Sequence, residues 1–230
     1  MKSQSPDQTS LNKPVKKQDF VSPEKQKELE CRLCNFLLSK YSDLINESER
    51  RTIGEIKGLV NSDDLTIQAI LADLKPEGFS FEKNFLETAE KVFDFVVSEI
   101  NFVELSLNLN YWLSPKEIFS EKIADDEDLA IFLCSLLLGL GDEKAFVVLA
   151  ELDNQQTHSF VITESGENFL ILDPSQKHGF SKFFGNRDKV LMDYSFKGAK
   201  IRQFLYKFNH STYEQFVEPN SDNAYSDNNL

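Results

Sequence analysis

The segment from Ala130 to Gly141, AIFLCSLLLGLG, is apolar at nearly every position and follows four consecutive acidic residues, Asp125 to Asp128. A helix that is apolar on all sides must be covered by other elements on all sides. The acidic residues suit the positive end of the helix dipole, and glycines such as Gly139 and Gly141 commonly end helices. The segment is too short to cross a bilayer, which takes about 20 residues. The sequence therefore predicts a core built around one central buried helix.

The periodicity changes on either side of this central helix. Before it, residues 83–100 keep apolar side chains at i, i+3 and i+4, which predicts an amphipathic helix. Ser114, Pro115 and Glu117 form a capping-box pattern, so a short helix is expected there. After it come short β-branched and aromatic segments, which predict strands in KAFVVLAEL, THSFVIT, NFLILD and AKIRQFLYKFN. We predict an α+β fold, with a helical N-terminal part and the central helix packed on an antiparallel sheet of four or five strands.

Four regions are predicted along the 230 residues. Residues 1–21 and 217–230 are polar and predict disordered tails, the second one acidic. Residues 22–78 predict a helical extension, and residues 79–216 predict the main domain. In the extension, Cys31 and Cys34 are expected on the apolar face of a helix that starts at Ser22-Pro23. Two further short helices are expected, one after residues 46–48 and one after the cap at residues 61–64, the second with Leu65, Ile67, Ile70 and Leu71 on its apolar face.

The formal net charge of −13 disfavours binding to nucleic acid and to anionic membranes, and favours a basic peptide or protein partner. Three cysteines do not suggest a disulfide framework, and the polar N-terminal residues do not resemble a signal peptide, so a cytoplasmic location is expected. Cys31 and Cys34 have no second pair with which to bind zinc. We expect no cofactor and no metal.

Three polar features follow one another in the order that thiol acyl-transfer chemistry requires. The acidic residues Asp125 to Asp128 open the central helix, His158 lies at the start of a strand, and Asp173 ends the next strand. A helix N-terminus activates a nucleophile, a histidine on a neighbouring strand accepts its proton, and an acid orients the imidazole. Each residue also has a plain structural interpretation: Asp126 as a helix-capping acid, His158 as a structural histidine, and Asp173-Pro174 as a turn.

This ordered set resembles the transglutaminase-like (papain-type) superfamily over roughly residues 83–209. The stretch ADDEDLAIFLCSLLLGLG is similar to the Gly-Asp-Cys-x-Asp-His-Ala motif of that family and the apolar helix after it. The resemblance puts Asp126 at the position of the nucleophilic cysteine, His158 at the histidine and Asp173 at the aspartate of Leu-Asp-Pro-Thr. A shifted register would put Asp125 or Glu127 there instead, and neither supplies a thiol. The resemblance implies a cysteine-proteinase-type fold in residues 79–216.

An aspartate cannot serve as a thiolate, and Cys134, eight residues into the apolar helix, is expected to be buried and inert. The sequence therefore favours a catalytically inactive domain that binds a protein or peptide in the former cleft, lined by Trp112 and Asp128. Trp112 could equally be a packing aromatic. Two alternatives remain: a hydrolase with non-thiol chemistry at Asp126, His158 and Asp173, and a purely structural scaffold. The same three residues could also hold a divalent metal.

Overall fold

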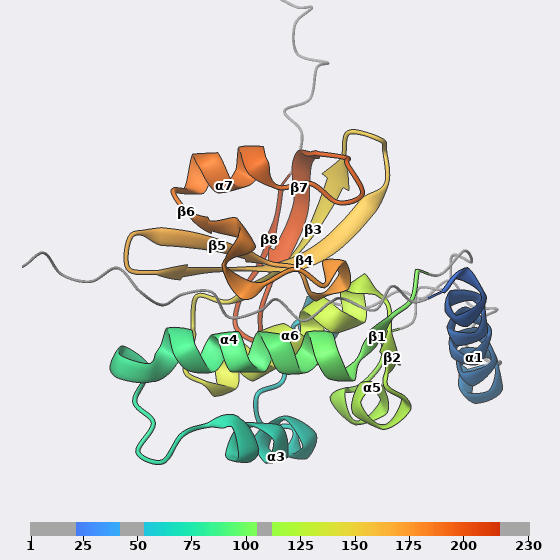
Figure 1. The fold of residues 1–230 in the computed structure, drawn as a ribbon, viewed down its shortest axis with the longest axis horizontal. Coiled ribbons are helices and arrows are strands. Elements are labelled where there is room, and N and C mark those ends of the chain that lie inside the picture. Colours follow the sequence, from blue (N-terminus) through green and yellow to red (C-terminus); the bar gives the residue numbers. More distant parts are fainter. Residues whose placement is uncertain (1–21, 42–52, 105–111, 217–230) are drawn as a thin grey trace, which may run out of the picture.

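The computed structural model describes residues 22–41, 53–104 and 112–216 (Figure 1). The described helices are α1 (Pro23–Tyr41), α2 (Ile53–Leu59), α3 (Leu65–Leu74), α4 (Phe81–Glu99), α5 (Pro115–Glu121), α6 (Asp126–Gly139) and α7 (Arg187–Asp193). The described strands are β1 (Asn101–Phe102), β2 (Ile123–Ala124), β3 (Phe146–Leu152), β4 (Thr157–Ser165), β5 (Asn168–Leu172), β6 (Phe184–Gly185), β7 (Ile201–Phe208) and β8 (Tyr213–Gln215). The tails predicted at 1–21 and 217–230, and a helix start near residues 46–48, lie outside the described residues.

The predicted α+β class is confirmed. An antiparallel sheet with strand order β6-β5-β4-β3-β7-β8 contains all four predicted strands, which form its centre. The described part of this sheet has six strands rather than four or five, because the two-residue β6 and the three-residue β8 extend its edges. Such short segments carry too little alternation to be recognised in a sequence. The parallel pair β1–β2 and helix α7 were not predicted either.

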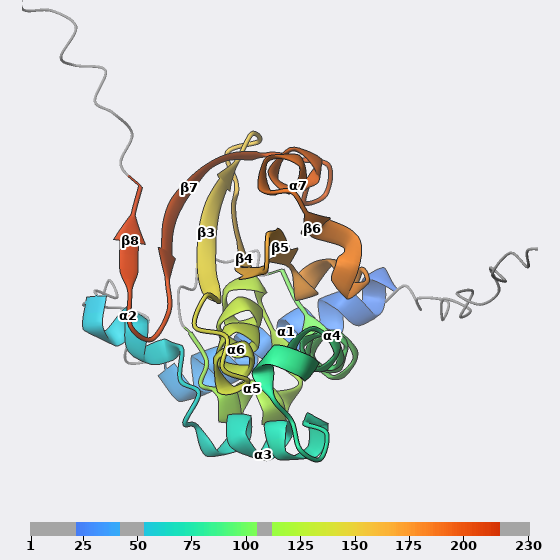
Figure 2. The same cartoon turned by 90° about the vertical axis from the view of Figure 1, so that its left-hand side faces the viewer.

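Helix α6 is the central buried helix that the sequence predicts. Every side chain from Leu129 to Leu138 is buried. The sheet lies on one side of α6, helix α3 lies on the opposite side, and helix α4 runs beside α6, as Figures 1 and 2 show from two directions. Asp125 caps the N-terminus by accepting a hydrogen bond from the amide of Asp128, and Gly141, with φ of +97°, follows the C-terminus. This packing fixes the direction in which the first turn of α6 faces the sheet.

The two helices predicted in the segment before α6 are also confirmed. Helix α4 buries the amphipathic face expected of it, with Phe85, Ala89, Val92, Phe93 and Val96 inside. The side chain of Ser114 and that of Glu117 exchange hydrogen bonds with the backbone in a complete capping box, with Pro115 in the first turn of α5. Helix α5 thus begins where local chemistry requires it.

In α1 the expected packing face is wrong in part. The buried side chains are Leu29, Leu33 and Leu37, while Cys31 is exposed and Cys34 is half-buried. Residues four apart share one helix face, and a residue two positions away lies on nearly the opposite side. The three leucines therefore define the packed stripe and leave Cys31 outside it.

Helix α3 buries Ile67, Ile70 and Leu71 as expected, but Leu65 is 86% exposed at its first position. The buried leucines of α1 and the buried residues of α3 belong to one hydrophobic cluster with α4, α6 and part of the sheet. No described helix is long and apolar enough to span a membrane.

Candidate functional site

The four acidic residues that open α6 have different contacts. Asp125 is the N-cap, and Asp126 is the first helical residue, whose carboxylate reaches the start of β4. Glu127 accepts a hydrogen bond from the indole of Trp112. Asp128 is buried and accepts a hydrogen bond of 2.7 Å from the amide of Leu113. Successive side chains on a helix point in directions about 100° apart. The four adjacent acidic side chains therefore make four separate contacts.

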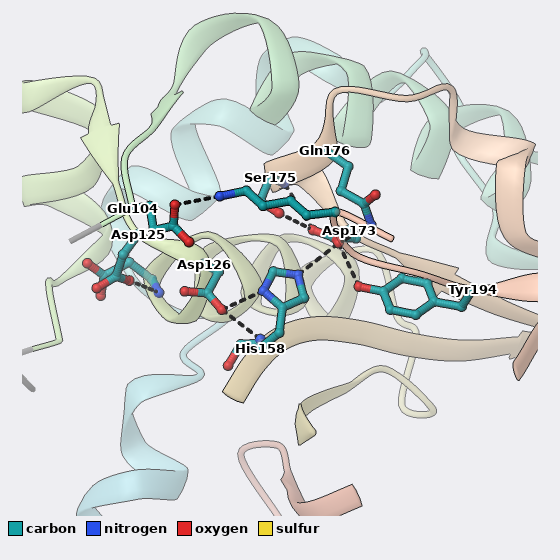
Figure 3. Close-up of polar contacts among 11 residues, drawn as sticks. Glu104, Asp125, Asp126, His158, Asp173, Ser175, Gln176 and Tyr194 are labelled. Atoms are coloured by element: carbon teal, nitrogen blue, oxygen red, sulfur yellow. Dashed lines mark hydrogen bonds and ion pairs between the residues drawn. The ribbon is translucent and has the colours of Figure 1, made fainter. Parts of the chain in front are cut away.

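The structure brings Asp126, His158 and Asp173 together, as Figure 3 shows. Oδ2 of Asp126 lies 2.8 Å from Nδ1 of His158, and it also accepts a hydrogen bond of 2.7 Å from the amide of Ser159. Oδ2 of Asp173 lies 2.9 Å from Nε2 of His158. The imidazole is therefore held between two carboxylates, one from the first turn of α6 and one from the end of β5.

Asp173 is fully buried and surrounded by hydrogen-bond donors. Its Oδ1 accepts from the amide and the hydroxyl of Ser175, at 3.1 and 2.6 Å. Its Oδ2 accepts from the side-chain amide of Gln176 and the hydroxyl of Tyr194, both at 2.7 Å. The Asp173-Pro174 step does start a turn, because Asp173 caps a short 3₁₀ helix at Pro174–Gln176. Its turn role and its contact with His158 coexist.

The charges of this group favour an ion pair. Burial by itself would lower the pKa of His158, but the charge of Asp173 and hydrogen bonds with both carboxylates raise it from 6.5 to about 9. Burial by itself would raise the pKa of Asp173, but the charge of His158 and hydrogen bonds from His158, Ser175 and Gln176 lower it to about 2. At neutral pH His158 is thus an imidazolium that donates a hydrogen bond from each nitrogen.

The ring of His158 is covered by a turn that precedes β7. The ring of Phe196 stacks on it with centroids 3.7 Å apart and planes 12° apart. The next residue, Lys197, forms an ion pair with Glu104, which follows β1. As a result His158 is 1% exposed, whereas the side chain of Asp126 is 24% exposed. The carboxylate of Asp126 is therefore partly accessible, while the imidazole is covered by Phe196.

Trp112 is half-buried beside the group. Its indole stacks near Phe208 with centroids 6.3 Å apart, and its N–H points to Glu127. Burial and the charge of Asp126 raise the pKa of Glu127 to about 7 despite the hydrogen bond from Trp112. Trp112 and Asp128 thus attach the segment before α5 to the first turn of α6.

Cys134 is fully buried within α6, as expected, and burial and the nearby charge of Asp142 raise the pKa of its thiol. Among the described residues, no group of three or more His, Cys, Asp or Glu side chains is arranged to hold a metal ion.

Several contacts of the site were not predicted. The Ser175 contact had a weak signal, since an aspartate before proline often binds the amide two residues later. Tyr194 comes from a segment 21 residues after Asp173, and Phe196 lies close to it in the chain. No local pattern marks either residue, because only the fold brings Tyr194 to Asp173 and Phe196 to His158.

One protein-family model matches the chain, that of the CEP76 peptidase-like domain, over residues 110–197. The match covers less than half of the chain and includes Asp126, His158 and Asp173. It supports a cysteine-peptidase-like, transglutaminase/papain-type fold for this part. No curated protein shows significant sequence similarity to the chain.

Solved structures give weaker similarities. LapG of Legionella pneumophila is 17% identical, with a TM-score of 0.47 over 83% of this chain and 87% of that one. Its calcium-bound form is 18% identical, with a TM-score of 0.44 over 68% of this chain and 88% of that one. A candidate cysteine protease from Cytophaga hutchinsonii is 14% identical, with a TM-score of 0.38 over 59% of this chain and 47% of that one. With TM-scores below 0.5, these similarities add no support for a function. Within residues 110–197, the chain is similar to the CEP76 peptidase-like domain.

Proposed function

We propose that the chain contains a catalytically inactive transglutaminase-like domain that binds another protein or peptide. The observation that carries the proposal is the carboxylate of Asp126, which lies 2.8 Å from Nδ1 of His158. In the enzymes that the sequence resembles, a cysteine would face the histidine here. The carboxylate is an alternative partner for the same imidazole, with an added hydrogen bond from the amide of Ser159.

Two further features argue against catalysis with the residues that are present in this domain. Cys134 is buried in α6, and its thiol has a raised pKa, so it cannot replace the missing nucleophile. His158, with a pKa of about 9, is protonated at neutral pH and cannot accept a proton from a nucleophile. Loss of the nucleophile and loss of the base therefore accompany each other.

Binding is the function that such a domain retains. A net charge of −13 attracts basic partners and repels nucleic acids and anionic surfaces. The match to a peptidase-like domain supports a partner that is a polypeptide.

The variant Asp126→Cys tests the alignment on which this proposal rests. We expect its new thiol to be activated, because it would lie at the N-terminus of α6 beside His158. Alkylation by iodoacetamide at pH 6.5, followed by mass spectrometry, should be at least about tenfold faster at position 126 than at Cys31, an exposed thiol in the same molecule.

The double variant Asp126→Cys, His158→Gln is the matched control, and it should bring the rate back toward that of Cys31. Equal rates at position 126 and at Cys31 in the single variant would show that the position is not that of a nucleophile.

The contact between Asp126 and His158 also supports a second candidate, a hydrolase with non-thiol chemistry, because such an enzyme needs these groups within hydrogen-bond reach. Its test is hydrolysis of a panel of peptide and ester substrates by the natural chain and by Asp126→Asn. We expect no hydrolysis by either. Activity that only the natural chain shows would favour the hydrolase. A purely structural scaffold would use exposed apolar residues of the N-terminal helices, of which Ile53 and Leu65 are examples.

A further inference from the structure

A cavity of about 420 Å³ lies at the end of α6 that is remote from Asp126. The N-terminal end of α4, the loop after α6 and the β4–β5 turn enclose it, and Figure 1 shows the first and last of these on the same side of the molecule. Since a helix rises 1.5 Å per residue, the 14 residues of α6 put this cavity roughly 20 Å from Asp126. Its size is in the range of ligand-binding pockets.

One wall of the cavity is aromatic. Phe81 and Phe85 lie one turn apart on α4, with ring centroids 4.6 Å apart. Phe81 is 38% exposed, so part of its ring faces the opening. Gly141 lies so near that an added Cβ would be 3.5 Å from the Phe81 ring. An accessible aromatic face attracts cations through its quadrupole.

The facing wall carries carboxylates. Asp142 is 1% exposed and is held by the hydroxyl of Thr163 at 2.6 Å and the amide of Lys144 at 3.2 Å. Burial raises its pKa to about 6, so the group is ionised at neutral pH and above. Glu143 and Glu164 add two exposed carboxylates, and Glu164 pairs with Lys144 at 3.2 Å.

The charge of the whole lining is negative. Four acidic and two basic side chains line the cavity: Glu82, Asp142, Glu143, Glu164, Lys83 and Lys144. The negative end of the α6 dipole adds to this field, and one cation already binds there, because Lys75 donates a hydrogen bond of 2.7 Å to the carbonyl of Gly139. A group that is flat, positively charged and carried on an apolar stem fits both walls.

We propose that this cavity binds an arginine side chain of a basic partner protein. The guanidinium stacks on Phe81 and donates hydrogen bonds to the carboxylates opposite, while its methylene stem lies against Phe85. The proposal deepens the proposed binding function, on which it rests, by naming the chemistry of the partner. It does not depend on the identity of the residue at position 126.

The test is a titration of the ¹⁵N-labelled full chain with the peptide acetyl-Gly-Arg-Gly-amide, followed through the amide signals of Gly141 and Gly166, which lie on two walls. We expect saturable shifts with a dissociation constant in the millimolar range, since a single side chain supplies the contact. The neutral peptide acetyl-Gly-norleucine-Gly-amide should produce no saturable shift.

Glu143→Gln and Glu164→Gln should each weaken arginine binding by about threefold to tenfold, because each removes one charge from the lining. Phe81→Leu should weaken it similarly, since it keeps an apolar side chain but removes the ring. The control Glu167→Gln makes the same change of charge on the β4–β5 turn outside the lining and should leave binding unchanged.

Equal effects of Glu167→Gln and Glu164→Gln, equal shifts with the norleucine peptide, or no saturable shift would overturn the proposal. A failure here would leave the Asp126→Cys result intact, and an unreactive thiol at position 126 would leave arginine binding intact. The two proposals therefore fail separately.

Discussion

His158 donates a hydrogen bond from each ring nitrogen, to Asp126 at 2.8 Å and to Asp173 at 2.9 Å. Charges buried in this way are costly to desolvate, so an intact buried ion pair adds little net stability, whereas removal of one partner is costly. The fold therefore depends on keeping both partners of this ion pair. Its charge state links the stability of the fold to pH.

We expect the chain to lose stability as the pH rises through about 9. The folded-state pKa of His158 is raised from 6.5 to about 9, so its contribution is fully present below 6.5 and is lost as His158 deprotonates. The loss is on the order of 3 kcal/mol of unfolding free energy. Urea unfolding at pH 6, 7.5 and 9.5 measures it, and an NMR titration of His158 locates the midpoint directly.

The variant His158→Gln is the control, because other groups titrate in the same range. The difference in stability between the natural chain and this variant should shrink between pH 6.5 and 9.5. A difference that stays constant, together with an NMR midpoint near 6.5, would contradict the assignment of the ion pair.

Single residues were predictable where the chemistry is local or ordered along the chain. The sequence predicted Asp126, His158 and Asp173 as site residues, and the structure brings them into contact. The sequence did not predict Tyr194 or Phe196, because their contacts depend on how a distant turn folds back over the sheet. The two carboxylates hold His158 in its charged form although burial opposes that charge, and the degree of burial could not be predicted from the sequence.

At the scale of elements, α6 was predictable because a helix that is apolar on all sides can only be buried in the core. The packed face of α1 was not predictable, because its sequence offers more than one apolar stripe and the neighbouring elements select one. The close approach of α3 to α6 could not be predicted from the sequence either. It depends on Gly139, where an added Cβ would lie 2.3 Å from Cδ1 of Leu71.

We therefore expect Gly139→Ala to destabilise the fold by about 1–3 kcal/mol, because the buried side chain of Leu71 must move. The measurement is urea unfolding. Gly58→Ala in α2 is the matched control: nothing lies within 4 Å of its added Cβ, so better helix propensity should stabilise the chain by up to about 1 kcal/mol.

The double variant Gly139→Ala, Leu71→Ala separates steric conflict from other effects. The two changes should be less costly together than the sum of the single changes, because the smaller side chain makes room for the methyl group. Strict additivity would indicate that the α3–α6 contact is not the cause.

For the whole molecule, one hydrophobic cluster includes residues from α1 to β7. The predicted boundary at residue 78 separates a helical extension from the main domain in the sequence, yet Leu33 of α1 and Phe208 of β7 belong to the same cluster. A shared core makes independent unfolding of the two regions unfavourable.

Leu33→Ala should accordingly destabilise the entire fold by about 2–4 kcal/mol. The single tryptophan, Trp112, reports on the main domain, and far-ultraviolet circular dichroism reports on all helices. The urea transitions seen by the two probes should coincide and shift together. Leu65→Ala, at a position that is 86% exposed, should leave both transitions nearly unchanged. A helical transition that moves without the tryptophan transition would support a separate extension.

The stacking of Phe196 on His158 bears on which molecules could reach the imidazole. A single codon change at position 126 could supply a thiol that meets small reagents, but the imidazole would stay beneath an aromatic ring that is fastened through Lys197 to Glu104. Chemistry on a polypeptide at both groups would therefore require a second change, in the turn that carries Phe196, besides the change at position 126.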